Sequence, residues 1–88
     1  MIIYALEPMY DSRKSFYGKA HIIIDDNGEK TLISYETPVI KIDAAGNVRR
    51  LWFGYSVTTA RHINEFMQQE TGRKCNKATW DKMEVCIK

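Results

Sequence analysis

The sequence has few of the features that mark specialised classes of protein. Its 88 residues include two cysteines, two histidines and two prolines, and no apolar run approaches the roughly 20 residues that a membrane span needs. Two cysteines are too few for a disulfide framework, and the opening Met-Ile-Ile-Tyr-Ala-Leu-Glu-Pro has no basic leader typical of a signal peptide. These absences favour a cytoplasmic protein with reduced thiols and no membrane partner.

The motifs of common catalytic and cofactor chemistry are missing too. The chain has no Gly-rich phosphate loop, nucleophile elbow, His-Glu-x-x-His or Asp-rich calcium loop. A zinc site would need His21, His62, Cys75 and Cys86 to converge, whereas structural zinc ligands usually come in close pairs. For a Cys75–His62 dyad, nothing visible would orient the histidine or build an oxyanion hole. We therefore expect no enzyme, no metal site and no cofactor, with His21 as a core or boundary residue.

What remains is the composition of an ordinary small globular chain. With 44% hydrophobic and 27% charged residues, the chain can close one core, so we expect a single domain over residues 1–88. The net charge of +2 hides an asymmetry, because residues 1–43 carry five Lys/Arg against seven Asp/Glu while residues 44–88 carry eight against four. The basic residues therefore gather in the C-terminal half.

Alternating apolar residues predict a run of short strands. The predicted strands lie at the start of the chain up to Pro8 and over residues 16–25, 29–36, 38–43 and 48–55. Asn27-Gly28 is a strong signal for a tight hairpin, and Ala45-Gly46-Asn47 predicts a second turn. The string Ile-Asp-x-x-Gly occurs at both turns, which convergent turn chemistry explains as well as duplication does.

A helix follows the strands. Ser56-Val-Thr-Thr59 is a cluster of capping residues, apolar residues then recur at helical spacing, and Gly72 ends the run, which predicts a helix over about 58–71. A helical turn holding Trp80 is expected after Asn76, followed by a short strand over 84–88. The sequence thus predicts an α+β fold: an antiparallel sheet of four or five strands with two hairpins, and one main amphipathic helix packed on one face.

Basic residues interleaved with aromatic rings are a weak indication that the protein binds a macromolecule. Arg49 and Arg50 precede Trp52, and similar basic pairs precede Phe16-Tyr17 and Trp80. This pattern is typical of surfaces that bind single-stranded nucleic acid, and equally of a half-buried strand with core rings and solvated arginines. On a strand, Arg50 and Trp52 share a face. If solvent covers that face, Trp52 is a hot-spot candidate; if the helix covers it, Trp52 belongs to the core.

Three strings carry a family resemblance: Phe16-Tyr17-Gly18-Lys19-Ala20, Leu32-Ile33-Ser34-Tyr35-Glu36-Thr37-Pro38-Val39, and Tyr55-Ser56-Val57-Thr58-Thr59-Ala60-Arg61-His62-Ile63-Asn64-Glu65-Phe66. Over about residues 16–70 the chain resembles an uncharacterised family of short proteins encoded by phages, prophages and their bacterial hosts. The resemblance implies a small accessory protein of the bacterial cytoplasm and no catalytic residues.

Within the last string, four polar residues have no evident structural reason to be present. We expect Arg61 and Glu65 on the outer face of the helix, one turn apart as a weak surface ion pair, and His62 and Asn64 at its margins. For His62, a boundary hydrogen bond and a functional contact both stay open.

Three hypotheses follow. The first is a non-enzymatic accessory protein that binds a host or phage protein, for example to inhibit a defence or nucleic-acid-processing complex. The second is direct nucleic-acid binding through the basic and aromatic residues, and the third, an enzyme or small-ligand protein, needs a cleft around His62 and Cys75. A homodimer through an exposed strand edge is compatible with all three. The candidates for macromolecule binding are Arg49, Arg50, Trp52, Arg61, His62, Asn64, Glu65, Arg73 and Lys74.

Overall fold

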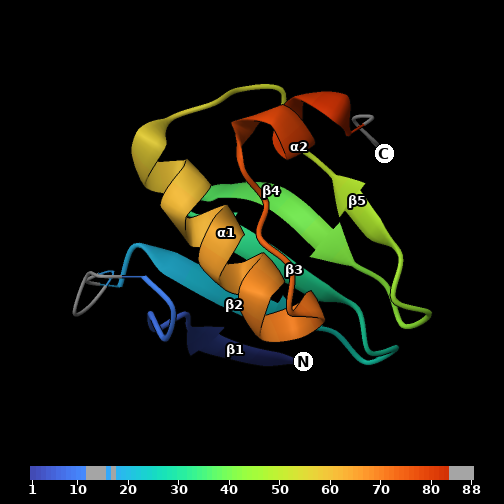
Figure 1. Ribbon diagram of the computed structural model, residues 1–88. Helices are drawn as coiled ribbons and strands as arrows, with labels where there is room; N and C mark the ends of the chain where they lie inside the picture. Colours follow the sequence, from blue (N-terminus) through green and yellow to red (C-terminus); the bar gives the residue numbers. More distant parts are fainter. Residues whose placement is uncertain (12–15, 17, 84–88) are drawn as a thin grey trace.

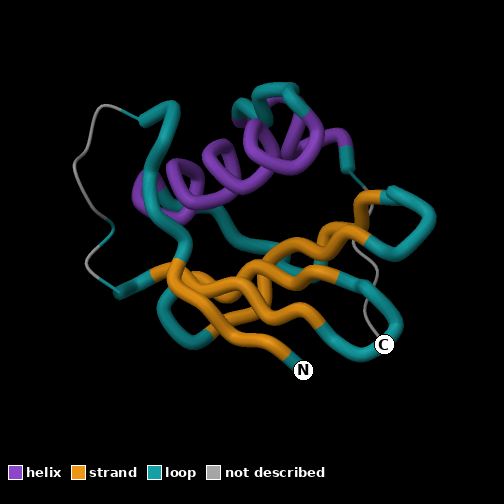
Figure 2. Tube along the Cα trace, turned by 90° about the horizontal axis from the view of Figure 1, so that it is seen from below, coloured by secondary structure: helices purple, strands orange, loops and turns teal. Residues whose placement is uncertain are grey.

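The chain is arranged in two layers, a sheet and a pair of helices that lie over one face of it (Figures 1 and 2). This computed structural model describes residues 1–11, 16 and 18–83. The antiparallel strands follow one another across the sheet in chain order: β1 (Ile2–Ala5), β2 (Ala20–Ile24), β3 (Lys30–Ser34), β4 (Thr37–Ile42) and β5 (Val48–Arg50). The helices are α1 (Val57–Thr71) and α2 (Lys77–Lys82). The predicted α+β fold is confirmed.

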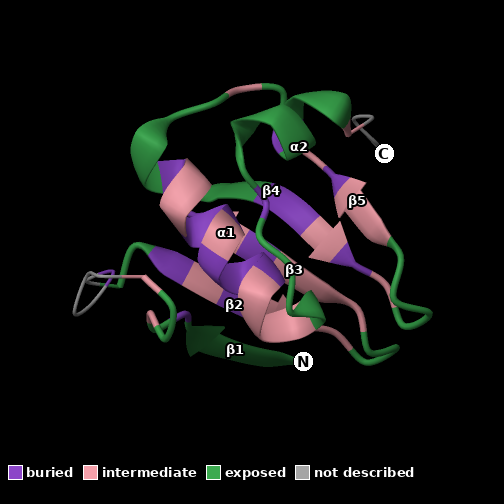
Figure 3. Ribbon diagram, viewed as in Figure 1, coloured by how far each residue is buried: buried purple, intermediate pink, exposed green. Residues whose placement is uncertain are grey.

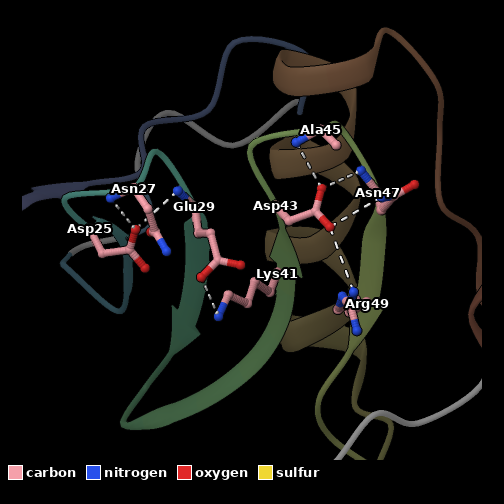
Figure 4. A network of polar contacts seen from close by, with 8 residues as sticks. All are labelled: Asp25, Asn27, Glu29, Lys41, Asp43, Ala45, Asn47 and Arg49. Carbon is pink, nitrogen blue, oxygen red and sulfur yellow. Dashed lines mark hydrogen bonds and ion pairs between the residues drawn. The ribbon is translucent and has the colours of Figure 1, made fainter.

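Two hairpins with the same turn chemistry join β2 to β3 and β4 to β5. In each, one carboxylate oxygen of an aspartate, Asp25 or Asp43, accepts the backbone N–H groups of the residues two and four positions later (Figure 4). A glycine three positions after the aspartate takes a positive φ, 86° at Gly28 and 89° at Gly46. The repeated Ile-Asp-x-x-Gly string therefore serves the bend itself.

A register shift between β3 and β4 changes which residues of β4 face inward. Leu32 pairs with Ile40 and Ile33 pairs with Pro38, so Val39 is the extra residue of a β-bulge. Val39 and Ile40, adjacent in sequence, are both buried, which a regular strand does not allow because consecutive side chains point to opposite faces.

The helices carry their predicted caps. Ser56 accepts the N–H of Thr59 at the start of α1, and Gly72, with φ 75°, ends it. Asn76 accepts the N–H of Thr79 at the start of α2. Among the described residues, no helix is both long and apolar enough to cross a membrane. The core between helices and sheet consists of Leu6, Phe16, Ala20, Ile22, Leu32, Val39, Ile40, Ile42, Ile63, Phe66, Met67, Cys75 and Trp80 (Figure 3).

Two predicted strands differ from the structure. The second predicted strand begins at Ala20 rather than at residue 16. The backbone N–H of Lys19 donates to the carbonyl of Phe16 (3.0 Å), and Gly18 takes a positive φ of 72°, so the chain turns before the strand starts. The last strand of the sheet ends at Arg50 rather than at residue 55, because the carbonyls of Trp52 and Phe53 turn toward the Arg50 guanidinium instead of a neighbouring strand. The predicted strand over 84–88 lies outside the described residues.

Candidate functional site

The side chains on the face of the sheet opposite the helices take no part in the core of the described residues. Residues paired directly across antiparallel strands point to the same side of a sheet, so the register defines two rows on this side. The first row is Ile3, Ile23, Thr31, Lys41 and Arg49, and the second is Ala5, His21, Ile33 and Pro38. These nine residues are called the uncovered face, since both helices lie on the other side (Figure 2).

The uncovered face is mostly aliphatic. Antiparallel sheets with one solvated side usually place polar residues there. Here five of the nine side chains come from isoleucine, alanine and proline, and none from phenylalanine, tyrosine or tryptophan. Ile3 is 61% exposed, and Ile23 and Ile33 are partly exposed. Contiguous exposed aliphatic surface of this kind marks sites where another apolar surface docks.

The basic end of the uncovered face is largely neutralised. Lys41 Nζ lies 3.0 Å from a carboxylate oxygen of Glu29, and an Arg49 Nη atom lies 3.7 Å from Asp43 (Figure 4). The backbone amides of its turn, with Asn47 as the largest contributor, hold the pKa of Asp43 below its usual range. The predicted binding residue Arg49 is thus at the surface, but it shares its charge with an aspartate.

Arg50, a candidate for macromolecule binding from its sequence pattern, is buried and holds the fold together. It is 8% exposed, and its guanidinium donates to the carbonyl oxygens of Trp52 (2.7 Å), Phe53 (2.8 Å) and Trp80 (2.8 Å). It also lies 4.3 Å from the centre of the Trp80 ring, a cation–π geometry. Of the two alternatives for Trp52, the structure shows packing against the core.

The expected outer-face pair of α1 is wrong. Glu65 is 1% exposed and accepts the backbone N–H groups of Tyr10 (2.8 Å) and Asp11 (2.9 Å) and the side-chain amide of Gln69 (2.7 Å). Arg61 pairs with Asp11, 3.1 Å away, instead of with Glu65. Burial raises the pKa of Glu65, but these hydrogen bonds outweigh it and the pKa lies below its usual range. Both residues therefore fasten the segment after β1 to the helix.

His62 and Asn64 are also used within the fold. His62 is buried rather than marginal, and its Nδ1 lies 2.8 Å from the hydroxyl of Ser34, so the expected hydrogen bond is present. Asn64 accepts the backbone N–H of Cys75 at 3.0 Å and so ties the segment after α1 back to the helix. The burial of His62 is predictable from helical spacing, because His62 lies four residues before buried Phe66 on the same face of α1.

The remaining basic candidates do not form one surface. Arg73 and Lys74 are exposed after the end of α1, in the helix layer. Arg49 lies on the uncovered face, on the opposite side of the sheet from the helices. Of the aromatic partners, Trp80 is in the core and Trp52 packs against it, whereas Phe53 and Tyr55 are exposed. Arg13, Lys14 and Tyr17, which belong to the first basic–aromatic string, lie outside the described residues.

A shallow cleft lies between α1 and α2, where the hypothesis of an enzyme or small-ligand protein needs one. It has a volume of about 300 Å³ and is lined in part by Tyr55, Arg61 and Cys75, but not by His62. Cys75 is buried, and burial raises the pKa of its thiol, which disfavours the reactive thiolate. In the part of the chain that is described, no group of three or more His, Cys, Asp or Glu residues could hold a metal ion.

Comparison with known proteins places the chain in a family. Residues 4–82 match the model of DUF8033, a family of unknown function. The chain belongs to that family. Comparison with curated proteins and with solved structures gave no match. DUF8033 membership agrees with the expected uncharacterised family, whereas the phage and prophage setting stays a prediction.

Replacing Arg50 tests whether its buried guanidinium holds the fold. Arg50→Ala leaves three carbonyl groups without their donor, so we expect a loss of about 2–4 kcal/mol in the free energy of unfolding, measured by urea titration. Arg49→Ala is the matched control, and its surface ion pair predicts a loss below about 1 kcal/mol. Equal losses in the two variants would contradict the assignment.

Glu65 predicts a pH dependence. Because its pKa is lower in the folded chain than in the unfolded chain, its stabilisation is complete above the unfolded pKa of about 4.3 and is lost as the pH falls through the folded value. Glu65→Gln should therefore lower the free energy of unfolding by about 1–3 kcal/mol at neutral pH, and the difference from the parent chain should shrink in acid. Exposed Glu36→Gln is the control and should show no such gap; a Glu65→Gln deficit independent of pH would refute this account.

Proposed function

We propose that this member of DUF8033 is a non-enzymatic accessory protein of phages and prophages that binds a host or phage protein in the bacterial cytoplasm. The observation that carries the proposal is the aliphatic character of the uncovered face, where Ile3 and Ile23 lie side by side and Ile33 lies one row along. These side chains contribute nothing to the core, which is on the opposite side of the sheet.

Binding a protein would remove this aliphatic surface from water. Burial of apolar area is worth roughly 25 cal/mol per Å², and a surface already rigid loses little conformational freedom on association. The uncovered face meets that condition because its central residues sit on β2, β3 and β4, whose opposite side chains, Ile22, Leu32 and Ile40, are in the core. A flat aliphatic surface held in this way fits a protein partner with a complementary apolar patch.

Direct nucleic-acid binding remains the alternative, with less support from the geometry. Sheets that bind single-stranded RNA stack bases on several exposed aromatic rings, whereas the uncovered face carries no Phe, Tyr or Trp and a single, partly exposed imidazole, that of His21. The cations there, Lys41 and Arg49, face carboxylates that compete with phosphates. Arg73 and Lys74, exposed after the end of α1, form a basic pair available to this alternative.

The proposed mode of action is occlusion. A binding protein without catalytic machinery acts by covering a surface of its partner, so its effect depends on stoichiometry and affinity. Inhibition of a defence or nucleic-acid-processing complex is the form of this activity that fits an accessory protein of phages. The expected inhibition is therefore equimolar and reversible on dilution.

Site-directed photo-cross-linking tests the binding face. A photoreactive amino acid in place of Ile23 should give a discrete protein adduct in infected or lysogenic bacterial cells, because this position lies at the centre of the uncovered face. The same probe at Val57, an exposed apolar residue on the helix layer, is the matched control. With the partner then purified, Ile33→Glu should weaken binding by about tenfold or more, since a charge would be buried in an apolar interface. Equal cross-linking from the two positions, or an unchanged affinity, would rule the face out.

Fluorescence anisotropy with single-stranded RNA and DNA tests the alternative. We expect no saturable binding at low salt, because most described cations of the sheet are paired with carboxylates. Binding that falls steeply with salt, and that Arg73→Ala with Lys74→Ala weakens, would instead establish nucleic-acid binding. Arg50 variants are unsuitable for this purpose because they perturb the fold.

A further inference from the structure

β1 is an exposed, apolar edge of the sheet. It pairs with β2 on one side, and among residues 1–11, 16 and 18–83 no strand pairs with its other side. The helix layer does not reach it, so Ile2 (60% exposed) and Tyr4 (40%) are accessible on one face and Ile3 on the other (Figure 3). Residues 1–6 contain no charged side chain. β1 therefore presents both faces and one edge to its surroundings.

The free edge of β1 offers a defined set of backbone groups. Leu6 donates its N–H to the carbonyl of Ala20 at 2.9 Å. Because hydrogen bonding alternates along an antiparallel strand, Tyr4 and Ile2 also direct their backbone groups to β2. Ile3 and Ala5 consequently direct both N–H and C=O away from the sheet.

The two edges of the sheet differ in their protection. Natural edges are usually shortened, charged, kinked or covered. β5 is three residues long and carries Arg49 beside Asp43, and the chain after it curls around the Arg50 guanidinium. β1, four residues long, is also short, but it carries no charged side chain and no proline within its span, since Pro8 lies beyond it. An edge of this kind is suited to pairing with another strand.

We propose that β1 pairs antiparallel with β1 of a second copy of this chain, joining the two sheets into one. A twofold axis beside Tyr4 places Ile3 of each copy opposite Ala5 of the other. The outward N–H and C=O groups of both residues then form four hydrogen bonds between the copies. Tyr4 meets Tyr4 of the second copy at a non-hydrogen-bonded position, where opposing side chains approach closely.

The second copy fits this edge for reasons particular to β1. The outward groups lie one residue on either side of Tyr4, so the strand is its own complement under a twofold rotation. An uncharged strand also does not repel itself. In this register Ile3 and Ala5, both on the uncovered face, lie opposite each other, so the helices of both copies lie on one side and the uncovered faces merge on the other.

The dimer goes beyond the proposed function, because it doubles the aliphatic surface available to a protein partner. Strand pairing over four residues is a small interface, at the low end of specific contacts. We therefore expect a reversible dimer whose population rises with concentration, rather than a permanent one.

Sedimentation over a concentration series tests the pairing. The parent chain should show a monomer–dimer equilibrium. Ala5→Pro removes an outward N–H without breaking the ladder to β2, a substitution that sheet edges tolerate, and should weaken dimerisation by about tenfold or more. Ala5→Ser keeps the N–H and should dimerise like the parent chain. Thermal unfolding of both variants shows whether the fold is retained.

Cysteine cross-linking tests the register independently. Tyr4→Cys should give a disulfide-linked dimer under mild oxidation, because the two positions face each other across the axis within bridging distance. Ile2→Cys, displaced along the strand, should not, and it also controls for the native cysteines. A parent chain that stays monomeric, or a dimer that is indifferent to Ala5→Pro and not cross-linked through position 4, overturns the proposal. Ile33→Glu should leave the dimer intact, so a failure of the dimer is distinguishable from a failure of the proposed binding face.

Discussion

The Arg50 guanidinium joins parts of the chain that the sheet alone would leave separate. Its three carbonyl partners come from the residues just after β5 and from α2, thirty positions away in sequence. Trp80, beneath the guanidinium, returns a hydrogen bond from its indole to Gly54 (3.0 Å). This arrangement satisfies a buried charge with carbonyl dipoles instead of a carboxylate. It ends the sheet at β5 and holds α2 over that end.

At the opposite end of the sheet, polar contacts from α1 limit how far the helix layer extends. Glu65 and Arg61 hold the segment after β1, and His62 reaches Ser34 at the end of β3. The helix is thereby centred on the middle strands, and β1 lies beyond it (Figure 1). The exposure of β1 and of the uncovered face thus has one cause: the core formed by the described residues lies on one side of the sheet, beneath helices that do not cover β1.

The sequence predicts those features of the fold that depend on residues close together in the chain, such as turns and helix caps. Asn27-Gly28, the Ser56 cap and Gly72 located the first hairpin and α1 because each acts within a few residues of itself. The sequence leaves the exposure of Arg50 open and favours an outer-face position for Glu65, because charged residues are mostly exposed. Their burial depends on carbonyls and amides supplied by distant segments, which no local pattern reveals. The aliphatic alternation of β2 and β3 was visible, but the side that the helix would cover was not.

The bulge at Val39 divides β4 into two parts, and the alternation of inward and outward side chains is interrupted between them. Beyond the bulge, the pairing of Leu32 with Ile40 sets which residues face the core; before it, the pairing of Ile33 with Pro38 sets which face outward. A single extra residue thus absorbs the offset between the β3–β4 turn and the rest of the sheet. If β4 kept its length but lost the bulge, the register on one side of Val39 would slip by one residue and exchange core aliphatics for the lysine and proline that now face out. The bulge therefore keeps both parts of β4 in phase with β3 while burying one more aliphatic side chain than a regular strand of this length would.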